Sequence, residues 1–505
     1  MRIVTSALVL LVSVSLNAQV ATFYIDANNG NDSNTGSLNQ PFKTISKGLG
    51  TMGSTIGTIY LRGGIHSSAS KITLSNNGQS ANFIKIWAYQ NEKPAIDFTG
   101  NSSDGFSIKG SYYHLKGIEV INAGHNGINI LGNNNIVENC VIHNNGNTGL
   151  HITAGNGATG SGPSNNLITN CDSYYNFDSP AGGNADGFSA KWTVGEGNVF
   201  KGCRSYNNSD DGWDLWMCTG SITIDSCFAF RNGVDIWHTG SVNGNGNGFK
   251  LGGNNAATPH IVKNCVSFDN SGNGGKGFDE NNNLAGQTLY NCTSFRNKNN
   301  NYAFYNDPLI SGQHTIKNCI SFQSGKDDVI KNATQEKNSW QGFTVVSNDF
   351  ISLDTSGISA PRDVYGYLPS NTFLKLAQSS SLIDAGVDVG IKYSGIAPDL
   401  GAFEFAANSS VGLPVITSPP LALQQNYPNP FTSLTTICFS LSTNEHVSLK
   451  IFNSLNEVII NLLDDFLKPG QYSYQWDAKN MATGLYFCTL TCGNRQNIKK
   501  LILLK

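Results

Sequence analysis

Residues 264–270 read NCVSFDN, and six other segments of the chain repeat this pattern. In each copy an aromatic residue or histidine follows the cysteine by three positions. An asparagine follows the cysteine by five positions, except in the last copy, which has Ser324 there. Neighbouring cysteines are 24 to 38 residues apart, a spacing typical of a solenoid whose coils each add the same short strands to a stack. The repeated cysteines are Cys140, Cys171, Cys203, Cys227, Cys265, Cys292 and Cys319.

The repeat predicts an all-β fold. Short apolar runs between Gly- and Asn-rich turns favour strands that pair in parallel with the next coil, about 4.8 Å away. Equivalent residues then form ladders. We expect the aromatic residues to stack inside, and each asparagine to adopt a left-handed bend and bind the amide above it. Leucine-dominated repeats, which a leucine-rich horseshoe would need, are absent from the sequence, so we predict a right-handed parallel β-helix solenoid.

The first residues of the chain indicate export. Arg2 precedes an apolar run that ends near the small residue Ala18, which is typical of a cleaved signal peptide over residues 1–18, with the mature chain starting at about Gln19. No other stretch approaches the roughly 20 apolar residues of a membrane-spanning helix. We therefore expect a protein that is secreted or held at the cell surface.

Cysteine placement and net charge narrow the class of protein further. The chain has 11 cysteines, and their repeated position predicts a column of small buried thiols rather than a disulfide framework, although pairing between neighbours stays open. The net charge is only −3 and no basic stripe is present, which argues against nucleic acid as a partner. We expect a monomer.

A second alignment follows the cysteine segments and brings acidic residues together. Residues 186–191 read DGFSAK, residues 211–216 read DGWDLW and residues 247–252 read NGFKLG. In this register Asp186 and Asp211 share a column on adjacent coils, and Asp214 shares a column with Lys250. Asp210 adjoins Asp211. Four carboxylates should therefore converge on one patch, with Lys250 one rung away.

Four carboxylates this close repel one another unless a cation lies among them. An all-oxygen set without His or Cys disfavours zinc and suits Ca²⁺, while Mg²⁺ remains open. A bound Ca²⁺ would neutralise the carboxylate of a sugar acid and acidify the adjacent C–H, which a neutral Lys250 could deprotonate. The cation must then outweigh the aspartates in lowering the pKa of Lys250, and without it the aspartates should raise that pKa.

Within ADGFSAKW, NNSDDGWDLW and GNGFKLGG, these five residues resemble polysaccharide lyase family 9, the pectate lyases with a parallel β-helix. The resemblance covers about residues 22–405. It implies that Asp186, Asp210, Asp211 and Asp214 hold Ca²⁺ and that Lys250 is the base of β-elimination on polygalacturonate, an acidic plant cell-wall polysaccharide. The departing glycosidic oxygen would take a proton from water, or would leave without the help of an acid.

Other functions stay open from the sequence alone. A β-helix lyase could act on rhamnogalacturonan or alginate instead. A glycoside hydrolase with paired aspartates would leave Lys250 without a role. A non-catalytic surface solenoid could bind polysaccharide with the aspartates holding structural Ca²⁺.

Further residues are weaker candidates for sugar contacts. Four tryptophans flank the patch and are either sugar platforms or, more often in a solenoid, core residues. Three arginines could bind uronate carboxylates. Residues 233–247 lengthen one coil and predict a cleft wall, in which His238 is a loop residue. The candidates are Trp192, Trp213, Trp216 and Trp237, and Arg204, Arg231 and Arg296.

The two ends of the chain carry separate signals. Residues 41–49, PFKTISKGL, predict a short capping helix begun by Pro41 that closes the N-terminal end of a solenoid domain over residues 19–405. Residues 406–420 read as a Ser- and Pro-rich linker. Alternating apolar and polar residues over 421–505 predict a small antiparallel β-sandwich.

The QNYPNPF opening and lysine-rich end of this last domain resemble the C-terminal sorting domain of the type IX secretion system. The resemblance implies that the type IX machinery is a partner and that export crosses the outer membrane. A carbohydrate-binding module is the alternative.

Overall fold

The computed structural model describes residues 21–405 and 422–504, apart from residues 241, 307–311, 364–365, 427, 442–443, 455–456, 469 and 493–494. The predicted signal peptide and linker lie outside the described residues. The chain divides into two compact units, 1–407 and 408–505.

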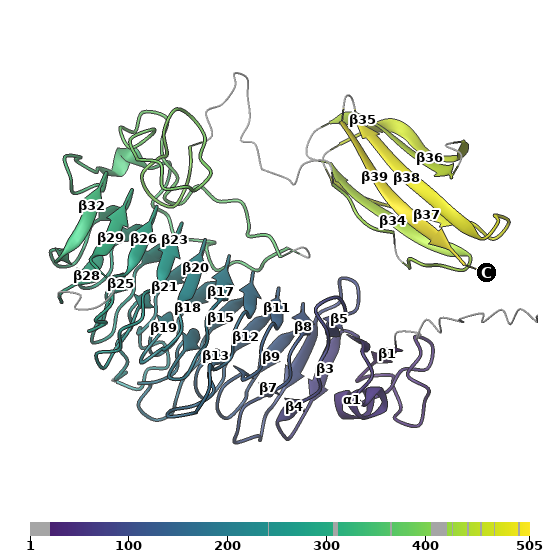
Figure 1. Cartoon of the computed structure of the whole chain (residues 1–505), viewed down its shortest axis with the longest axis horizontal. Coiled ribbons are helices and arrows are strands. Elements are labelled where there is room, and N and C mark those ends of the chain that lie inside the picture. The colour runs from purple at the N-terminus through teal and green to yellow at the C-terminus, as the bar shows by residue number, and fades with distance from the viewer. Residues whose placement is uncertain are drawn as a thin grey trace, which may run out of the picture. The chain divides into compact units, whose positions relative to one another are not determined.

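The first unit is a parallel β-helix, as predicted (Figure 1). Three sheets run along it, with 12, 10 and 10 strands among the described residues; β2 to β31 give one strand of each coil to each sheet, and β1 and β32 extend the first sheet at its two ends. Each strand pairs with the equivalent strands of the coils before and after it. Equivalent strands run in the same direction, so every pairing within these sheets is parallel. The backbone hydrogen bonds of one coil are thus satisfied by its neighbours.

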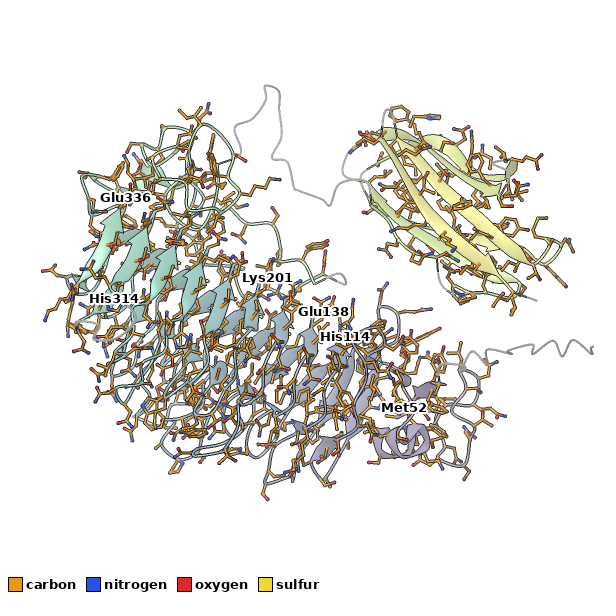
Figure 2. All side chains as sticks on the ribbon, viewed as in Figure 1. Met52, His114, Glu138, Lys201, His314 and Glu336 are labelled. Atoms are coloured by element: carbon orange, nitrogen blue, oxygen red, sulfur yellow. The ribbon has the colours of Figure 1, made fainter. Side chains whose placement is uncertain are left out.

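The first sheet consists of β1 (Ala21–Ile25), β2 (Gly57–Leu61), β5 (Ile84–Ala88), β8 (Tyr113–Lys116), β11 (Ile136–Glu138), β14 (Leu167–Thr169), β17 (Asn198–Lys201), β20 (Ile222–Asp225), β23 (Ile261–Lys263), β26 (Thr288–Tyr290), β29 (His314–Lys317) and β32 (Ala333–Glu336). Its outer face carries polar side chains. His114 Nε2 on β8 and Glu138 Oε2 on β11 lie 2.8 Å apart, a hydrogen-bonding distance across neighbouring strands (Figure 2).

The second sheet consists of β4 (Ile72–Leu74), β7 (Phe106–Ile108), β10 (Ile128–Ile130), β13 (Leu150–Ile152), β16 (Phe188–Ala190), β19 (Trp213–Asp214), β22 (Phe249–Lys250), β25 (Phe278–Asp279), β28 (Tyr302–Phe304) and β31 (Val329–Ile330). The third consists of β3 (Gly64–Ser67), β6 (Pro94–Asp97), β9 (Glu119–Ile121), β12 (Val141–His143), β15 (Asp172–Tyr174), β18 (Arg204–Tyr206), β21 (Phe228–Phe230), β24 (Val266–Phe268), β27 (Thr293–Phe295) and β30 (Ile320–Phe322).

The aromatic ladder of the repeat forms, but the prediction that it lies inside the solenoid is wrong. Its rings stack, for example Tyr206 on Phe230 at 4.8 Å and Phe230 on Phe268 at 4.7 Å between ring centroids. They belong to a cluster on the outer side of the third sheet, where they pack against residues from the segment 343–403, such as Phe373. This returning segment includes η1 (Ser347–Asp349) and keeps the outward rings from water.

Inside the solenoid a different aromatic ladder stacks on the second sheet. Phe188, Trp213, Phe249 and Phe278 follow one another at 4.9 Å between ring centroids. The repeated cysteines share this core. All 11 cysteines of the chain lie within the described residues and are free thiols, which agrees with the predicted column.

The asparagine ladder is confirmed as a chain of amide hydrogen bonds. Asn208 Nδ2 donates to Asn232 Oδ1 at 3.0 Å, and Asn232 Nδ2 donates to Asn270 Oδ1 at 3.0 Å. The left-handed bend, however, falls one residue earlier, at Asn207 and Arg231, where φ is 54° in both. The ladder asparagines themselves are therefore free to point inward and satisfy buried backbone groups.

The N-terminal end is covered by α1 (Ile45–Met52), which lies beside β1 (Figure 1). The helix begins later than predicted. Thr44, not Pro41, caps it, because the Thr44 hydroxyl accepts a hydrogen bond from the backbone N–H of Lys47 at 3.1 Å. Ile45 and Met52 are buried in the solenoid core. Among the described residues, no helix is sufficiently long and apolar to cross a bilayer.

The second unit is antiparallel. One sheet contains β33 (Ala422–Leu423), β34 (Leu434–Leu441) and β37 (Gly470–Asp477), and the other contains β36 (Val458–Leu467), β35 (Glu445–Asn453), β38 (Gly484–Cys492) and β39 (Arg495–Leu503). Their inward residues, including Leu449, Trp476 and Leu490, form a separate core, as expected for the predicted sandwich.

Candidate active site

Three adjacent strands of the second sheet position the site. Phe188 pairs with Trp213 and Trp213 with Phe249, so these apolar residues fill the interior. The next residue of each strand points outward. Asp214 pairs with Lys250, as the sequence predicted.

The remaining aspartates lie in the turns that lead into these strands. Asp186 precedes β16, and Asp210 and Asp211 precede β19. Gly187, which follows Asp186, has no room for a side chain, because a Cβ there would meet the Ser205 hydroxyl at 1.9 Å. The Gly187 N–H donates to the Asp211 carbonyl at 3.0 Å, so the two acidic turns lie side by side.

The four carboxylates converge. Each of Asp186, Asp210, Asp211 and Asp214 offers an oxygen, and these oxygens all lie within 4.8 Å of one another. None of the four residues is more than 3% exposed. We call these four residues the acidic quartet.

Backbone and hydroxyl groups hold the quartet in place. Asn245 N–H donates to Asp210 Oδ1 at 2.6 Å, and Asn247 N–H donates to Asp211 Oδ1 at 2.7 Å. Thr148 Oγ1 donates to Asp186 Oδ2 at 3.1 Å. The two asparagines end the lengthened coil over residues 233–247, so this insertion builds part of the site. The sequence did not single out either asparagine or the threonine.

Two lysines reach the quartet. Lys250 Nζ lies 3.0 Å from Asp211 Oδ2 and 3.3 Å from Asp214 Oδ2. Lys191, which the sequence prediction missed, places its Nζ 2.8 Å from Asp186 Oδ2 and 2.6 Å from Asp214 Oδ2. The sequence did contain a signal for Lys191. Ser189 pairs with Asp214 and points outward with it, and Lys191, two residues after Ser189, lies on the same outward face.

The charges of the site shift its pKa values strongly. Burial raises the pKa of Asp186, Asp210 and Asp211, and repulsion between the carboxylates adds to the rise. For Lys250, burial favours the neutral amine, but Asp211, Asp214 and the other carboxylates together outweigh it and hold the pKa well above its usual value. This is the direction predicted for the site without a cation.

The quartet fits a hard divalent cation. Asp211 Oδ2 is buried and accepts no well-directed hydrogen bond, although the Lys250 ammonium lies nearby. When all four carboxylates are ionised, they and the two ammonium groups sum to a charge of −2, which one divalent ion would cancel. All the offered ligands are oxygens, the set that Ca²⁺ and Mg²⁺ prefer.

The quartet borders a cleft of about 420 Å³, to whose lining it contributes Asp210 and Asp214. Its lining includes Lys250 and Lys191, the insertion residue Asn245, and the two tryptophans Trp192 and Trp216. Trp213 does not line it, because this residue is fully buried in the core. Trp237 stacks on Phe177 at 4.8 Å between ring centroids, and it too is absent from the lining.

The three candidate arginines are elsewhere. Arg204 is buried, pairs with Asp172 and donates to the Ala360 carbonyl at 3.0 Å. Arg231 donates to Thr355 at 2.9 Å, so both arginines hold the returning segment 343–403. Arg296 pairs with Asp269. None of the three lines the cleft.

Comparison with known proteins identifies the family. Residues 23–312 match the family described as "Pel9A-like, right handed beta helix region", and that description carries the predicted hand. Pectate lyase L of Dickeya chrysanthemi is 39% identical over 419 residues, covering 79% of this chain and 95% of the relative. The chain belongs to the Pel9A-like β-helix family of polysaccharide lyases.

Solved structures agree with this assignment. The crystal structure of pectate lyase Pel9A matches this lyase with a TM-score of 0.70 and 37% identity, over 76% of this chain and 97% of that chain. A rhamnogalacturonan lyase structure matches with a TM-score of 0.63 and 28% identity, over 71% and 96% of the two chains. The family predicted from the aspartate and lysine motifs is thereby confirmed.

The C-terminal unit of this lyase also matches a known family. Residues 425–504 correspond to the secretion system C-terminal sorting domain, which confirms the predicted resemblance. This match favours a sorting role over a carbohydrate-binding module and indicates a secreted or surface protein.

Proposed function

We propose that this lyase cleaves polygalacturonate by calcium-dependent β-elimination, with Lys250 as the base. The observation that carries the proposal is the placement of the Lys250 amine 3.0 Å from a buried quartet of carboxylates in an open cleft. The relatives named above as pectate lyases support pectate as the substrate.

Asp186, Asp210, Asp211 and Asp214 would hold the Ca²⁺. The bound ion would neutralise the carboxylate of a galacturonate residue and acidify the C–H beside it. The backbone N–H groups of Asn245 and Asn247 fix Asp210 and Asp211, so these two carboxylates need little rearrangement on binding.

Lys250 performs the proton transfer. With a divalent ion bound, the carboxylates would no longer hold this amine protonated. The neutral amine would take the C5 proton, the C5–H electron pair would form the C4–C5 double bond, and the bond from C4 to the glycosidic oxygen would break. The departing oxygen receives a proton from water. Lys250 is only 8% exposed and is held between Asp211, Asp214 and the amide oxygen of Asn245, so its amine has a narrow range of positions in the cleft.

Rhamnogalacturonan is the second candidate substrate, because a rhamnogalacturonan lyase shares this fold at 28% identity. The cleft is lined by polar and aromatic side chains that suit a sugar chain of either kind. The substrate comparison therefore belongs in the first experiment.

The test is an ultraviolet assay for the unsaturated product. The purified chain is incubated with polygalacturonate, methylated pectin, rhamnogalacturonan and alginate, each with calcium and with chelator. We expect absorbance to rise with polygalacturonate and calcium, and to stay flat with chelator. Reducing ends without absorbance would indicate a hydrolase, and neither signal on any substrate would indicate a binding solenoid.

For the C-terminal unit, the proposed partner is the type IX secretion machinery, with export across the outer membrane. The match of residues 425–504 to a sorting domain supports this role. Deleting residues 421–505 should trap active lyase inside the producing cell. Normal export of the truncated chain would count against it.

A further inference from the structure

Lys191 is a second cation of the site, and the proposed reaction gives it no part. It follows β16, on the same coil as Asp186 and one coil before Asp214, and its ammonium contacts both carboxylates, at 2.8 and 2.6 Å. Its side chain is 13% exposed and lines the cleft.

The two lysines divide the quartet between them. Lys191 contacts Asp186 and Asp214, while Lys250 contacts Asp211 and Asp214. Asp214 Oδ2 is shared by both ammonium groups. The space between the carboxylates that a divalent ion would take is therefore bordered by two positive charges, and each repels such an ion.

The attachment of Lys191 allows its charge to move. The backbone of Lys191 is fixed, because its carbonyl accepts a hydrogen bond from Thr153 Oγ1 at 2.8 Å. The four-carbon stem beyond it is flexible, and Lys191 lines the cleft. The ammonium can leave the carboxylates without disturbing the coil.

We propose that Lys191 is a tethered counter-cation: it neutralises Asp186 and Asp214 while the quartet is empty, and it competes with the divalent ion for the same oxygens. Lys191 is thus a positioning residue that sets the affinity of the site for the ion. The inference rests on the proposed calcium site.

An alternative arrangement makes the opposite prediction. If Lys191 stayed on Asp186 and Asp214 as a permanent support, its removal would misplace two ligands and weaken calcium binding. The direction of the change in affinity separates the two arrangements.

The test is calorimetric titration of the whole metal-free chain with CaCl₂, comparing wild type with Lys191→Gln. We expect Lys191→Gln to bind Ca²⁺ about tenfold or more tightly, since a unit charge a few ångströms from a divalent ion is removed. The control is Lys317→Gln, because Lys317 pairs with Glu336 at 2.8 Å on the first sheet, away from the quartet. That control should keep the wild-type affinity.

Thermal unfolding supplies a second readout. In chelator, Lys191→Gln should melt below wild type because Asp186 loses its counter-charge, and added CaCl₂ should raise its melting temperature by more than it raises that of wild type. If Lys191→Gln does not fold in chelator, it is prepared in calcium and its affinity is measured by competition with a chelator.

The outcomes are distinct. Calcium binding in Lys191→Gln that is unchanged or weaker than in wild type would overturn the counter-cation role. Absence of calcium binding in the wild-type chain would instead overturn the proposed function itself.

Discussion

Lys250 lies one rung beyond Asp214 in the second sheet, with its Nζ 3.3 Å from Asp214 Oδ2. Parallel pairing with no shift in register places the two residues in one outward column, so the amine and the carboxylate belong to successive coils. The proposed chemistry depends on this column, because it sets the base directly beside the cation ligands.

Removing the amine should stop the chemistry but not the binding of calcium. Lys250→Ala should lower the elimination rate by about 10³-fold, near the middle of the range for loss of a general base. Calcium should still bind, at least as tightly as in wild type, because the variant loses a positive charge and no carboxylate. Product absorbance and calorimetry measure the two effects.

The control for this substitution is Lys317→Ala. Lys317 also pairs with a carboxylate, that of Glu336 at 2.8 Å, but it lies on the first sheet and does not line the cleft. Its removal should leave turnover close to wild type. Wild-type turnover by Lys250→Ala would show that another group is the base.

Losing a carboxylate should affect both properties. Asp211→Asn keeps the shape of Asp211 but removes one negative charge from the quartet. The calcium dissociation constant should rise by at least about tenfold, because mutating a residue that merely supports a metal ligand already weakens metal binding by that much. Elimination should fall in parallel at low calcium and recover in part at high calcium. A titration of rate against calcium concentration tests this, and an unchanged midpoint would contradict the ligand role of Asp211.

Much of this column could be predicted from the sequence. The Asp-Gly and Asn-Gly pairs before β16, β19 and β22 mark the same turn in successive coils, and alternation along a strand then fixes which residues point outward. Asp214 and Lys250 fall at the same distance after these turns. Lys191 shares the outward face of Ser189, but its contact with Asp214 depends on a long side chain that crosses to the next coil, and aligned positions do not reveal such a contact.

The face on which the repeated aromatic residues lie could not be predicted for a different reason. Alternation divides a strand into two faces but does not say which one is the core. Phe230 and Phe268 look like core residues because they are buried, yet the returning segment 343–403 buries them from outside. That segment carries no repeat, so its packing left no pattern in the sequence.

The asparagine ladder should contribute to stability in a way that depends on burial. Asn270 Oδ1 accepts from Asn232 N–H at 3.1 Å and from its side-chain amide at 3.0 Å. Asn270→Ala leaves these buried donors unpaired and should lower the free energy of unfolding by about 3 kcal/mol. The exposed Asn273 is the control, and Asn273→Ala should change the free energy of unfolding by less than about 0.5 kcal/mol. Urea denaturation measures both, and equal effects would refute the role of the ladder.

A second internal ladder places a histidine where other coils have asparagine. His260 Nδ1 accepts the backbone N–H of Ile222 at 3.2 Å, as Asn198 Oδ1 accepts that of Asn166 at 3.0 Å in an earlier coil. His260 is 1% exposed and its Nε2 has no hydrogen-bond partner. Burial lowers the pKa of His260 to about 3.

The lowered pKa of His260 makes stability depend on pH. The unfolded chain binds a proton at this histidine below about pH 6.5, whereas the folded chain does so only near pH 3. The stabilisation of the neutral ring is therefore complete above pH 6.5 and is lost as the pH falls towards 3, by about 2 kcal/mol at pH 5. His260→Asn supplies the residue that the ladder uses elsewhere and does not titrate. Between pH 8 and pH 5 the variant should lose about 2 kcal/mol less stability than wild type in urea denaturation. Parallel curves for the two proteins would mean that His260 does not remain neutral in the fold.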